Sequence, residues 1–84
     1  MEKSLYAIID QSTTATTIFI YQRDGDLITK QVKHHKQISL QSGWLEHDPE
    51  EIIQNLREVL RASYKDLEQK GRSKDDIKSV IYLN

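Results

Sequence analysis

The distribution of apolar and polar residues predicts that strands make up the first half of the chain. Residues 5–9 form an uninterrupted apolar run, which is typical of a strand buried on both faces. Residues 16–21 are rich in β-branched and aromatic side chains and predict a second strand. The Asp-Gly pair within residues 23–26 predicts a hairpin turn. We expect a third strand at residues 27–38, where polar residues separate the apolar ones as at a sheet edge, and a loop at residues 39–44.

The second half of the chain predicts a long helix followed by one more strand. Asp48 is suited to cap the helix, and Pro49 fits its first position, where no backbone N–H is needed. Gly71 is the expected stop, residues 73–77 a short turn, and residues 80–83 a buried strand. The order of elements is then βββαβ, so the predicted fold class is α/β with a mixed sheet. The apolar residues that recur at helical spacing are Ile52, Leu56, Val59, Leu60 and Leu67.

Composition narrows the class of protein. The chain has 84 residues, which is enough for one domain at most, and it contains no cysteine, so disulfides and thiolate metal sites are excluded. The 12 basic residues against 13 acidic ones give no electrostatic basis for binding nucleic acid or an anionic membrane. No apolar stretch approaches the roughly 20 residues needed to cross a bilayer, and no secretory signal is evident. We therefore expect a soluble cytoplasmic protein.

A short polar segment follows the first predicted strand. Asp10 would lie at the carboxyl end of that strand, where ligands commonly approach an α/β sheet. A carboxylate in such a place can hold Mg²⁺, usually through water. Thr13 and Thr14 offer hydroxyl and backbone N–H groups that suit phosphate oxygens. The same residue types also form ordinary β-turns, so this segment alone does not decide between a phosphate site and a plain turn.

A second motif lies at residues 43–49 and reads Gly-Trp-Leu-Glu-His-Asp-Pro, with the only Trp and the only Pro of the chain. Together with residues 5–14, this motif resembles the amino terminus of the FGGY carbohydrate kinases, and among them the glycerol kinases. The resemblance runs from about residue 6 to residue 84. Gln11 and His47 favour the glycerol kinases over the xylulokinase-like branch of the family.

The resemblance implies that the turn between the first two strands lies along the phosphates of ATP, with Asp10 as the residue that holds Mg²⁺. The hydroxyl and N–H groups nearest the phosphates would belong to Thr13, Thr14 and Ala15. The nucleotide-binding residues that the resemblance implies are Asp10, Gln11, Ser12, Thr13, Thr14, Ala15 and Thr17.

Three of these positions differ from the usual family pattern. Ser12 stands where the family has Gly, which permits positive φ angles and a close approach of backbone to ligand. Ala15 replaces a Ser, which removes one hydroxyl, and Thr17 replaces the Arg that contacts the nucleotide in glycerol kinases. We therefore hypothesise that nucleotide binding is weakened or lost in this chain.

Two further groups of residues have less specific interpretations. The resemblance places the loop before the helix near the polyol pocket, which makes Trp44 and Glu46 weak candidates for substrate contact. His34 and His35 are neighbours on a strand, so their side chains point to opposite faces and cannot easily share a metal. We expect both histidines to be exposed on a polar strand.

The function implied by the resemblance is ATP-dependent phosphorylation of glycerol to glycerol 3-phosphate by the full-length family. Residues 1–84 would form an incomplete amino-terminal part of the first kinase domain, the start of an RNase H-like domain of the actin-like ATPase type. We expect the 84-residue chain alone to be inactive, because the catalytic Asp and the second domain would lie beyond it. Two alternatives stay open. One is a sibling kinase acting on a sugar or another polyol. The other is a non-catalytic truncated remnant or interaction module, which could form a homo-oligomer or bind a sheet-covering partner. An RNase H-type nuclease is disfavoured, because only Asp10 lies at a strand end.

Overall fold

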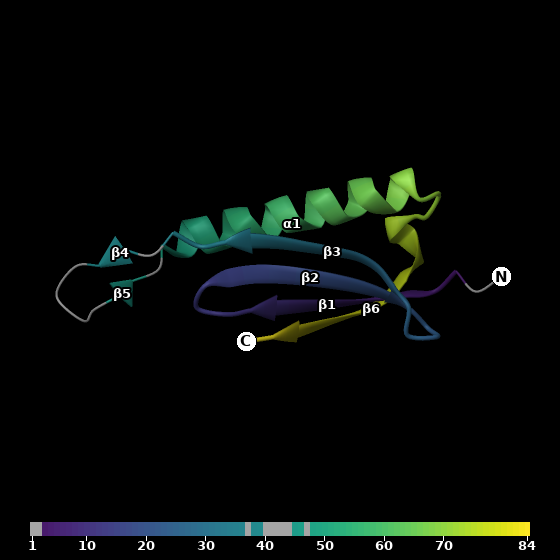
Figure 1. Cartoon of the computed structure of the whole chain (residues 1–84), viewed down its shortest axis with the longest axis horizontal. Coiled ribbons are helices and arrows are strands. Elements are labelled where there is room, and N and C mark those ends of the chain that lie inside the picture. The colour runs from purple at the N-terminus through teal and green to yellow at the C-terminus, as the bar shows by residue number, and fades with distance from the viewer. Residues whose placement is uncertain (1–2, 37, 40–44, 47) are drawn as a thin grey trace.

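The computed structural model describes residues 3–36, 38–39, 45–46 and 48–84. It contains a four-stranded mixed sheet with one long helix packed on it (Figure 1). The strand order is β3-β2-β1-β6, in which β6 runs parallel to β1 and the other neighbours are antiparallel. The elements are β1 (Leu5–Gln11), β2 (Ala15–Gln22), β3 (Leu27–His34), β4 (Ile38–Ser39), β5 (Leu45–Glu46), α1 (Pro49–Gln69), the 3₁₀ turn η1 (Lys74–Asp76) and β6 (Ile77–Leu83).

The predicted βββαβ order is confirmed for the main sheet, but the third strand is shorter than predicted. β3 ends at His34, which pairs with Ala15, the first residue of β2. The residues before Ala15 belong to the β1–β2 turn, so the residues after His34 have no β2 residue to pair with. Ile38 belongs instead to β4, which pairs with β5 in a separate two-stranded ribbon. The predicted loop at residues 39–44 is therefore wrong at Ser39, and its residues 40–44 lie outside the described part of the chain.

Both predicted ends of the helix are confirmed. The Asp48 carboxylate accepts the Glu50 N–H over 3.0 Å, which satisfies one of the free amides of the first turn. At the other end Gly71 has a φ of +72°, and the Arg72 N–H donates to the Leu67 carbonyl over 2.8 Å, as in a Schellman motif. Within the described residues, no helix combines the length and the apolar character that crossing a membrane requires.

The core lies between α1 and one face of the sheet, because α1 packs on β2 and β3 (Figure 1). Alternate residues of β1 and β2 point to this face, whereas the residues between them are partly exposed on the opposite face. The buried apolar cluster consists of Leu5, Ala7, Ile9, Ile18, Ile20, Val59 and Leu67.

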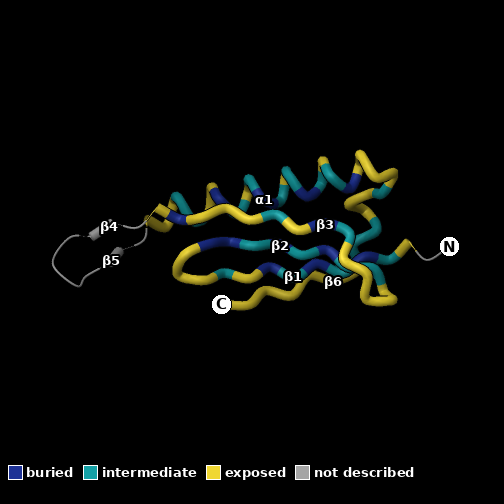
Figure 2. The backbone as a smooth tube through the Cα atoms, in the orientation of Figure 1, coloured by how far each residue is buried: buried dark blue, intermediate teal, exposed yellow. Residues whose placement is uncertain are grey.

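The last strand differs from the prediction in its burial. The apolar run at residues 80–83 predicted a buried strand, yet its side chains are 50–58% exposed. β6 is the edge strand of the sheet, and α1 lies over β2 and β3 rather than over β6. Figure 2 shows this strand exposed over most of its length, beside the buried positions of β1. Within the described residues, therefore, β6 packs against the core only at Ile77, and Lys78 to Leu83 are exposed.

Candidate functional site

The predicted phosphate turn lies at the edge of the sheet where the carboxyl ends of β1, β3 and β6 meet (Figure 1). Asp10 pairs with Thr17 on β2 and with Leu83 on β6. Since Ile9 is buried against the core, strand alternation directs Asp10 and its cross-strand neighbour Thr17 to the face opposite the helix. Asp10 is exposed there, so its carboxylate is accessible to a ligand at this edge of the sheet.

The turn between β1 and β2 is closed by hydrogen bonds that involve Ser12. The Ser12 N–H donates to the Ala15 carbonyl over 2.9 Å. The Ser12 hydroxyl oxygen accepts the N–H groups of Thr14 and Ala15 over 3.3 and 3.1 Å, and it lies 3.2 Å from the Ala15 carbonyl oxygen, to which it can donate. The amides of Thr14 and Ala15, which could bind a phosphate, therefore already have a partner inside the turn.

The three departures from the family pattern can be placed in the turn. Among the described residues only glycines have positive φ, so Ser12 occupies its position without backbone strain. Ala15 is 8% exposed, so little of it is accessible to a ligand. Thr17 is half-buried beside Asp10 on the open face of the sheet. Residues 12–14 are exposed, so the turn is accessible.

Behind the turn lies a buried polar cluster that sequence reasoning missed. His35 was expected to be exposed, and this is wrong, because its exposed fraction is 7%; His34 is exposed as predicted. The His35 ring has Gln11 and Thr16 on one side and Asn55 of α1 on the other.

The distances in this cluster are those of hydrogen bonds. His35 Nε2 lies 2.8 Å from Gln11 Nε2 and 3.2 Å from Thr16 Oγ1, and the Gln11 and Thr16 side chains lie 2.9 Å apart. His35 Nδ1 lies 2.8 Å from Asn55 Nδ2. Thr16 is fully buried and Asn55 is 4% exposed, so each of these polar groups depends on its neighbours for hydrogen bonds.

A periodic signal in the sequence could have indicated that His35 is buried. Thr29 faces the helix, and alternation from Thr29 places residues 31, 33 and 35 on the same face. On the helix, Asn55 lies on the side of Ile52 and Val59, which belongs to the predicted apolar face. Two polar residues at core-facing positions of neighbouring elements indicate a buried pair.

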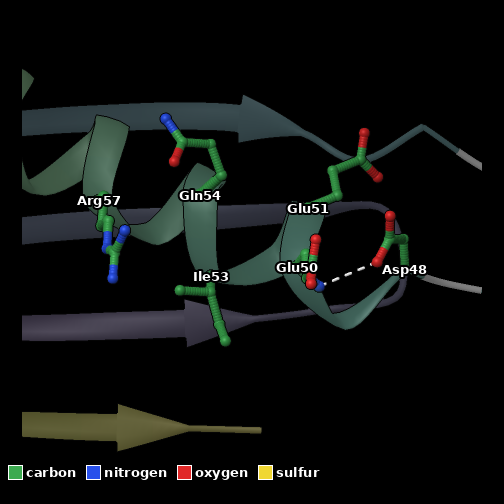
Figure 3. Close-up of a pocket in the computed structure, with 6 residues that line it drawn as sticks. All are labelled: Asp48, Glu50, Glu51, Ile53, Gln54 and Arg57. Carbon is green, nitrogen blue, oxygen red and sulfur yellow. Dashed lines mark hydrogen bonds between the residues drawn. The ribbon is translucent and has the colours of Figure 1, made fainter.

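The start of α1 forms a shallow depression of about 530 Å³, shown in Figure 3. Two of its three carboxylates accept local hydrogen bonds: Asp48 from the Glu50 N–H, and Glu51 from the Lys36 N–H over 3.1 and 3.2 Å. No group of three or more His, Cys, Asp or Glu residues suited to a metal occurs in the described part of the chain. The residues that line the depression are Asp48, Glu50, Glu51, Ile53, Gln54 and Arg57.

The two weak candidates for substrate contact cannot be placed in the site. Trp44 lies outside the described residues. Glu46 is described only as a backbone position of β5. A role for either side chain in polyol binding stays a prediction.

Comparison with known proteins identifies the family. The pattern of the FGGY family of carbohydrate kinases, N-terminal domain, matches residues 5–81. Glycerol kinase 2 of Streptomyces coelicolor is 39% identical over 78 residues, which are 93% of this chain and 15% of that protein. A glycerol kinase of Corynebacterium glutamicum is 46% identical over 54 residues, which are 64% of this chain and 11% of that protein.

Solved structures show the same relation. The structure of Plasmodium falciparum glycerol kinase with ADP has a TM-score of 0.69 and 36% identity, and gluconate kinase from Lactobacillus acidophilus has 0.70 and 31%. Each match covers 94% of this chain and 15% of the other, so the chain spans about 15% of the length of these relatives. The likeness confirms the predicted α/β fold of the actin-like ATPase type. The chain belongs to the FGGY family of carbohydrate kinases.

Proposed function

We propose that this chain supplies the phosphate-binding turn of a glycerol kinase-type enzyme, which transfers a phosphoryl group from ATP to glycerol and forms glycerol 3-phosphate. The observation that carries the proposal is the exposed turn at residues 12–14, located at the carboxyl ends of the strands in a chain 39% identical to a glycerol kinase. The two structural neighbours differ by 0.01 in TM-score, so the fold does not separate the substrates. Identity of 36% against 31% favours glycerol over gluconate.

The turn would bind phosphate through its amides and hydroxyls. Thr13 and Thr14 are exposed at the tip, and their N–H and hydroxyl groups are suited to phosphate oxygens once the Thr14 N–H leaves the Ser12 hydroxyl. Asp10 would hold Mg²⁺, and it is one accessible carboxylate beside the turn, which fits the way Mg²⁺ combines one or two carboxylates with waters and substrate phosphates. When bound, Mg²⁺ neutralises charge on the phosphates. Asp10 and the turn would thus orient the nucleotide.

The structure supports the hypothesis that nucleotide affinity is reduced. A phosphate that binds the amides of Thr14 and Ala15 must displace the Ser12 hydroxyl oxygen that accepts both. The expected reduction comes from this competition and from the absence of a cation at Thr17, because the neutral hydroxyl of Thr17 gives weaker hydrogen bonds than an Arg would.

The test is a titration of the ¹⁵N-labelled chain with ATP·Mg, followed by amide chemical shifts. We expect shifts confined to residues 10–17, with weak affinity, and smaller shifts in an Asp10→Asn variant, whose amide no longer provides an anionic ligand for Mg²⁺. If the amide signals of residues 10–17 do not shift, the proposal is contradicted. If the affinity is micromolar, the predicted weakening is contradicted. In a coupled assay for glycerol 3-phosphate, we expect no turnover by the chain alone, because it spans about 15% of its relatives.

A second candidate function, an interaction module, is favoured by the exposed edge strand. Val80, Ile81, Tyr82 and Leu83 are 50–58% exposed on β6, whose outer edge has free ladder positions. A second chain could pair with this edge and cover its apolar side chains. Light scattering after size-exclusion chromatography tests this, and a monomer that an Ile81→Lys variant does not change would exclude a homo-oligomer built on β6.

A further inference from the structure

We propose that His35 is a positioning residue for the β1–β2 turn, connecting the turn to helix α1 through Gln11 and Asn55. The proposal rests on the proposed function, because it assigns His35 a role in presenting the phosphate-binding turn. The resemblance that identified the turn did not include His35, and the structure places this histidine directly behind it.

His35 contacts the turn in two independent ways. Its backbone N–H donates to the Thr14 carbonyl over 2.8 Å, so the main chain after β3 holds the tip of the turn. Its ring approaches Gln11 and Thr16, which are paired residues immediately before and after residues 12–15. A single residue therefore contacts the tip of the turn and both strands that lead into it.

The Asn55 side chain determines which ring nitrogen carries the proton. Asn55 Nδ2 lies 2.8 Å from His35 Nδ1 and 3.5 Å from the His34 carbonyl oxygen. An amide nitrogen facing a carbonyl oxygen is a donor, so its other N–H donates to Nδ1, which must be unprotonated. In the neutral imidazole the proton is then on Nε2.

The proton on Nε2 determines the orientation of the Gln11 amide. Nε2–H needs an acceptor, and the Gln11 amide atom 2.8 Å away serves as one when it is the carbonyl oxygen. This reverses the amide orientation of the structure, in which Gln11 Nε2 faces the ring and Thr16 Oγ1 donates to Gln11 Oε1 over 2.9 Å. In the reversed orientation the Gln11 NH₂ group donates to Thr16 Oγ1 over that distance. With this orientation the donors and acceptors alternate from Asn55 through His35 and Gln11 to the hydroxyl oxygen of Thr16.

The chain of hydrogen bonds fixes the base of the turn against the helix. Thr16 is fully buried, Asn55 is 4% exposed and His35 is 7% exposed, so solvent cannot easily replace the contacts they lose. Removing the ring would leave Gln11 and Asn55 without a common partner and would allow Gln11, the last residue before Ser12, to reorient. The turn would lose its fixed conformation, while the apolar core, formed by other residues, would stay intact.

The first measurement is the protonation pattern of the His35 ring by long-range ¹⁵N–¹H correlation spectroscopy at neutral pH. We expect the signature of the Nε2–H tautomer in the unmodified chain. The Nδ1–H tautomer would overturn the proposed order of donors and acceptors. An Asn55→Leu variant, which removes the donor to Nδ1, should change the tautomer ratio.

The second measurement is amide hydrogen exchange in three variants. His35→Phe removes the ring nitrogens, His35→Gln restores one donor and one acceptor, and His34→Phe makes the same change on the neighbouring exposed residue as a control. We expect His35→Phe to reduce the protection of the Thr14 and Ala15 amides by about tenfold relative to the core amides of β1 and β2, the effect of one typical hydrogen bond. His34→Phe should leave this ratio unchanged, and His35→Gln should restore most of it.

A merely structural histidine would reduce the protection of all amides together and would leave the ratio unchanged, which would overturn the proposal. If His35→Phe does not fold, Asn55→Ala replaces it, because this variant keeps the ring and removes only its helix partner. If the protection of the Thr14 and Ala15 amides relative to the core amides is the same in Asn55→Ala as in the unmodified chain, the proposal is also overturned.

Titration with ATP·Mg separates this proposal from the proposed function. We expect ATP affinity about fivefold to tenfold lower in His35→Phe, the effect of about one lost hydrogen bond, and unchanged in His34→Phe. Equal affinity in the unmodified chain and His35→Phe would overturn the positioning role and leave the proposed function intact. A lower protection ratio in a chain that does not bind ATP would instead refute the proposed function and support the positioning of the turn.

Discussion

Replacement of Ser12 by Ala should strengthen nucleotide binding, which is unusual for a residue located inside a predicted binding turn. The Ser12 hydroxyl oxygen accepts the amides of Thr14 and Ala15 over 3.3 and 3.1 Å. A phosphate oxygen that takes these amides must first displace the hydroxyl. Ser12→Ala removes this competitor and keeps a Cβ, which limits the backbone conformations of the turn. Ser12→Gly would also remove the Cβ and so make the backbone more flexible.

The magnitude follows from the two hydrogen bonds that must be broken. A net contribution of about 0.5–1.5 kcal/mol for each gives about 1–3 kcal/mol. Distances above 3.0 Å favour the lower part of this range, about 1–2 kcal/mol. The expected gain in ATP affinity for Ser12→Ala is therefore about 5- to 30-fold.

Isothermal titration calorimetry with ATP·Mg measures this gain. Ser73→Ala is the matched control, because Ser73 also accepts a backbone N–H, from Asp75 over 3.1 Å, but caps the 3₁₀ turn η1 rather than the phosphate turn. The control should leave the affinity unchanged. If Ser12→Ala binds ATP more weakly than the unmodified chain, the hydroxyl assists phosphate binding, and the argument from competition is wrong.

Three further predictions concern stability and are tested by urea unfolding. The Thr29 hydroxyl and, to a smaller extent, the Lys70 ammonium donate hydrogen bonds to Asp66 and lower its pKa below the ordinary 3.8. The stability that this provides is present above pH 3.8 and is lost as the pH falls through the lowered pKa. Asp66→Asn should therefore be less stable than the unmodified chain at neutral pH, and this difference in stability should close in acid. Gly71→Ala should cost about 1–2 kcal/mol, since a Cβ there has no atom within 4 Å and only the φ of +72° opposes it, and an equal midpoint would contradict this. Leu67→Ala should cost about 2–5 kcal/mol, because Leu67 is fully buried, and a loss below 1 kcal/mol would show that the site refills.

The sequence was sufficient to predict features that depend on local chemistry. Asp48 and Pro49 start the helix and Gly71 ends it, because capping and positive φ depend on residue types within a few positions. The Asp-Gly hairpin is confirmed in the same way, with Gly25 at a φ of +98°. The position of the β1–β2 turn could likewise be located from a motif.

Features that depend on distant partners could not be predicted in this way. β3 ends where β2 runs out of residues to pair with, and this limit depends on the register with Ala15. The burial of His35 depends on Asn55, 20 residues further along the chain, and on Gln11, 24 residues before it. The exposure of β6 arises because α1 lies over β2 and β3, away from the β6 edge of the sheet. No pattern within residues 80–83 indicates where α1 packs.

The two features of the turn, its blocked amides and its fixed base, make one joint prediction. Ser12→Ala frees the amides of Thr14 and Ala15, but these bind a phosphate well only if both point to the same place. The fixed base that His35 provides through Gln11 keeps them so. The gain from Ser12→Ala should therefore shrink severalfold when His35→Phe is also present, although the two side chains make no hydrogen bond to each other among those described. Calorimetry of the single and double variants measures this coupling. Purely additive effects would show that the two features act independently, because each substitution would then change the binding free energy by the same amount whether or not the other is present.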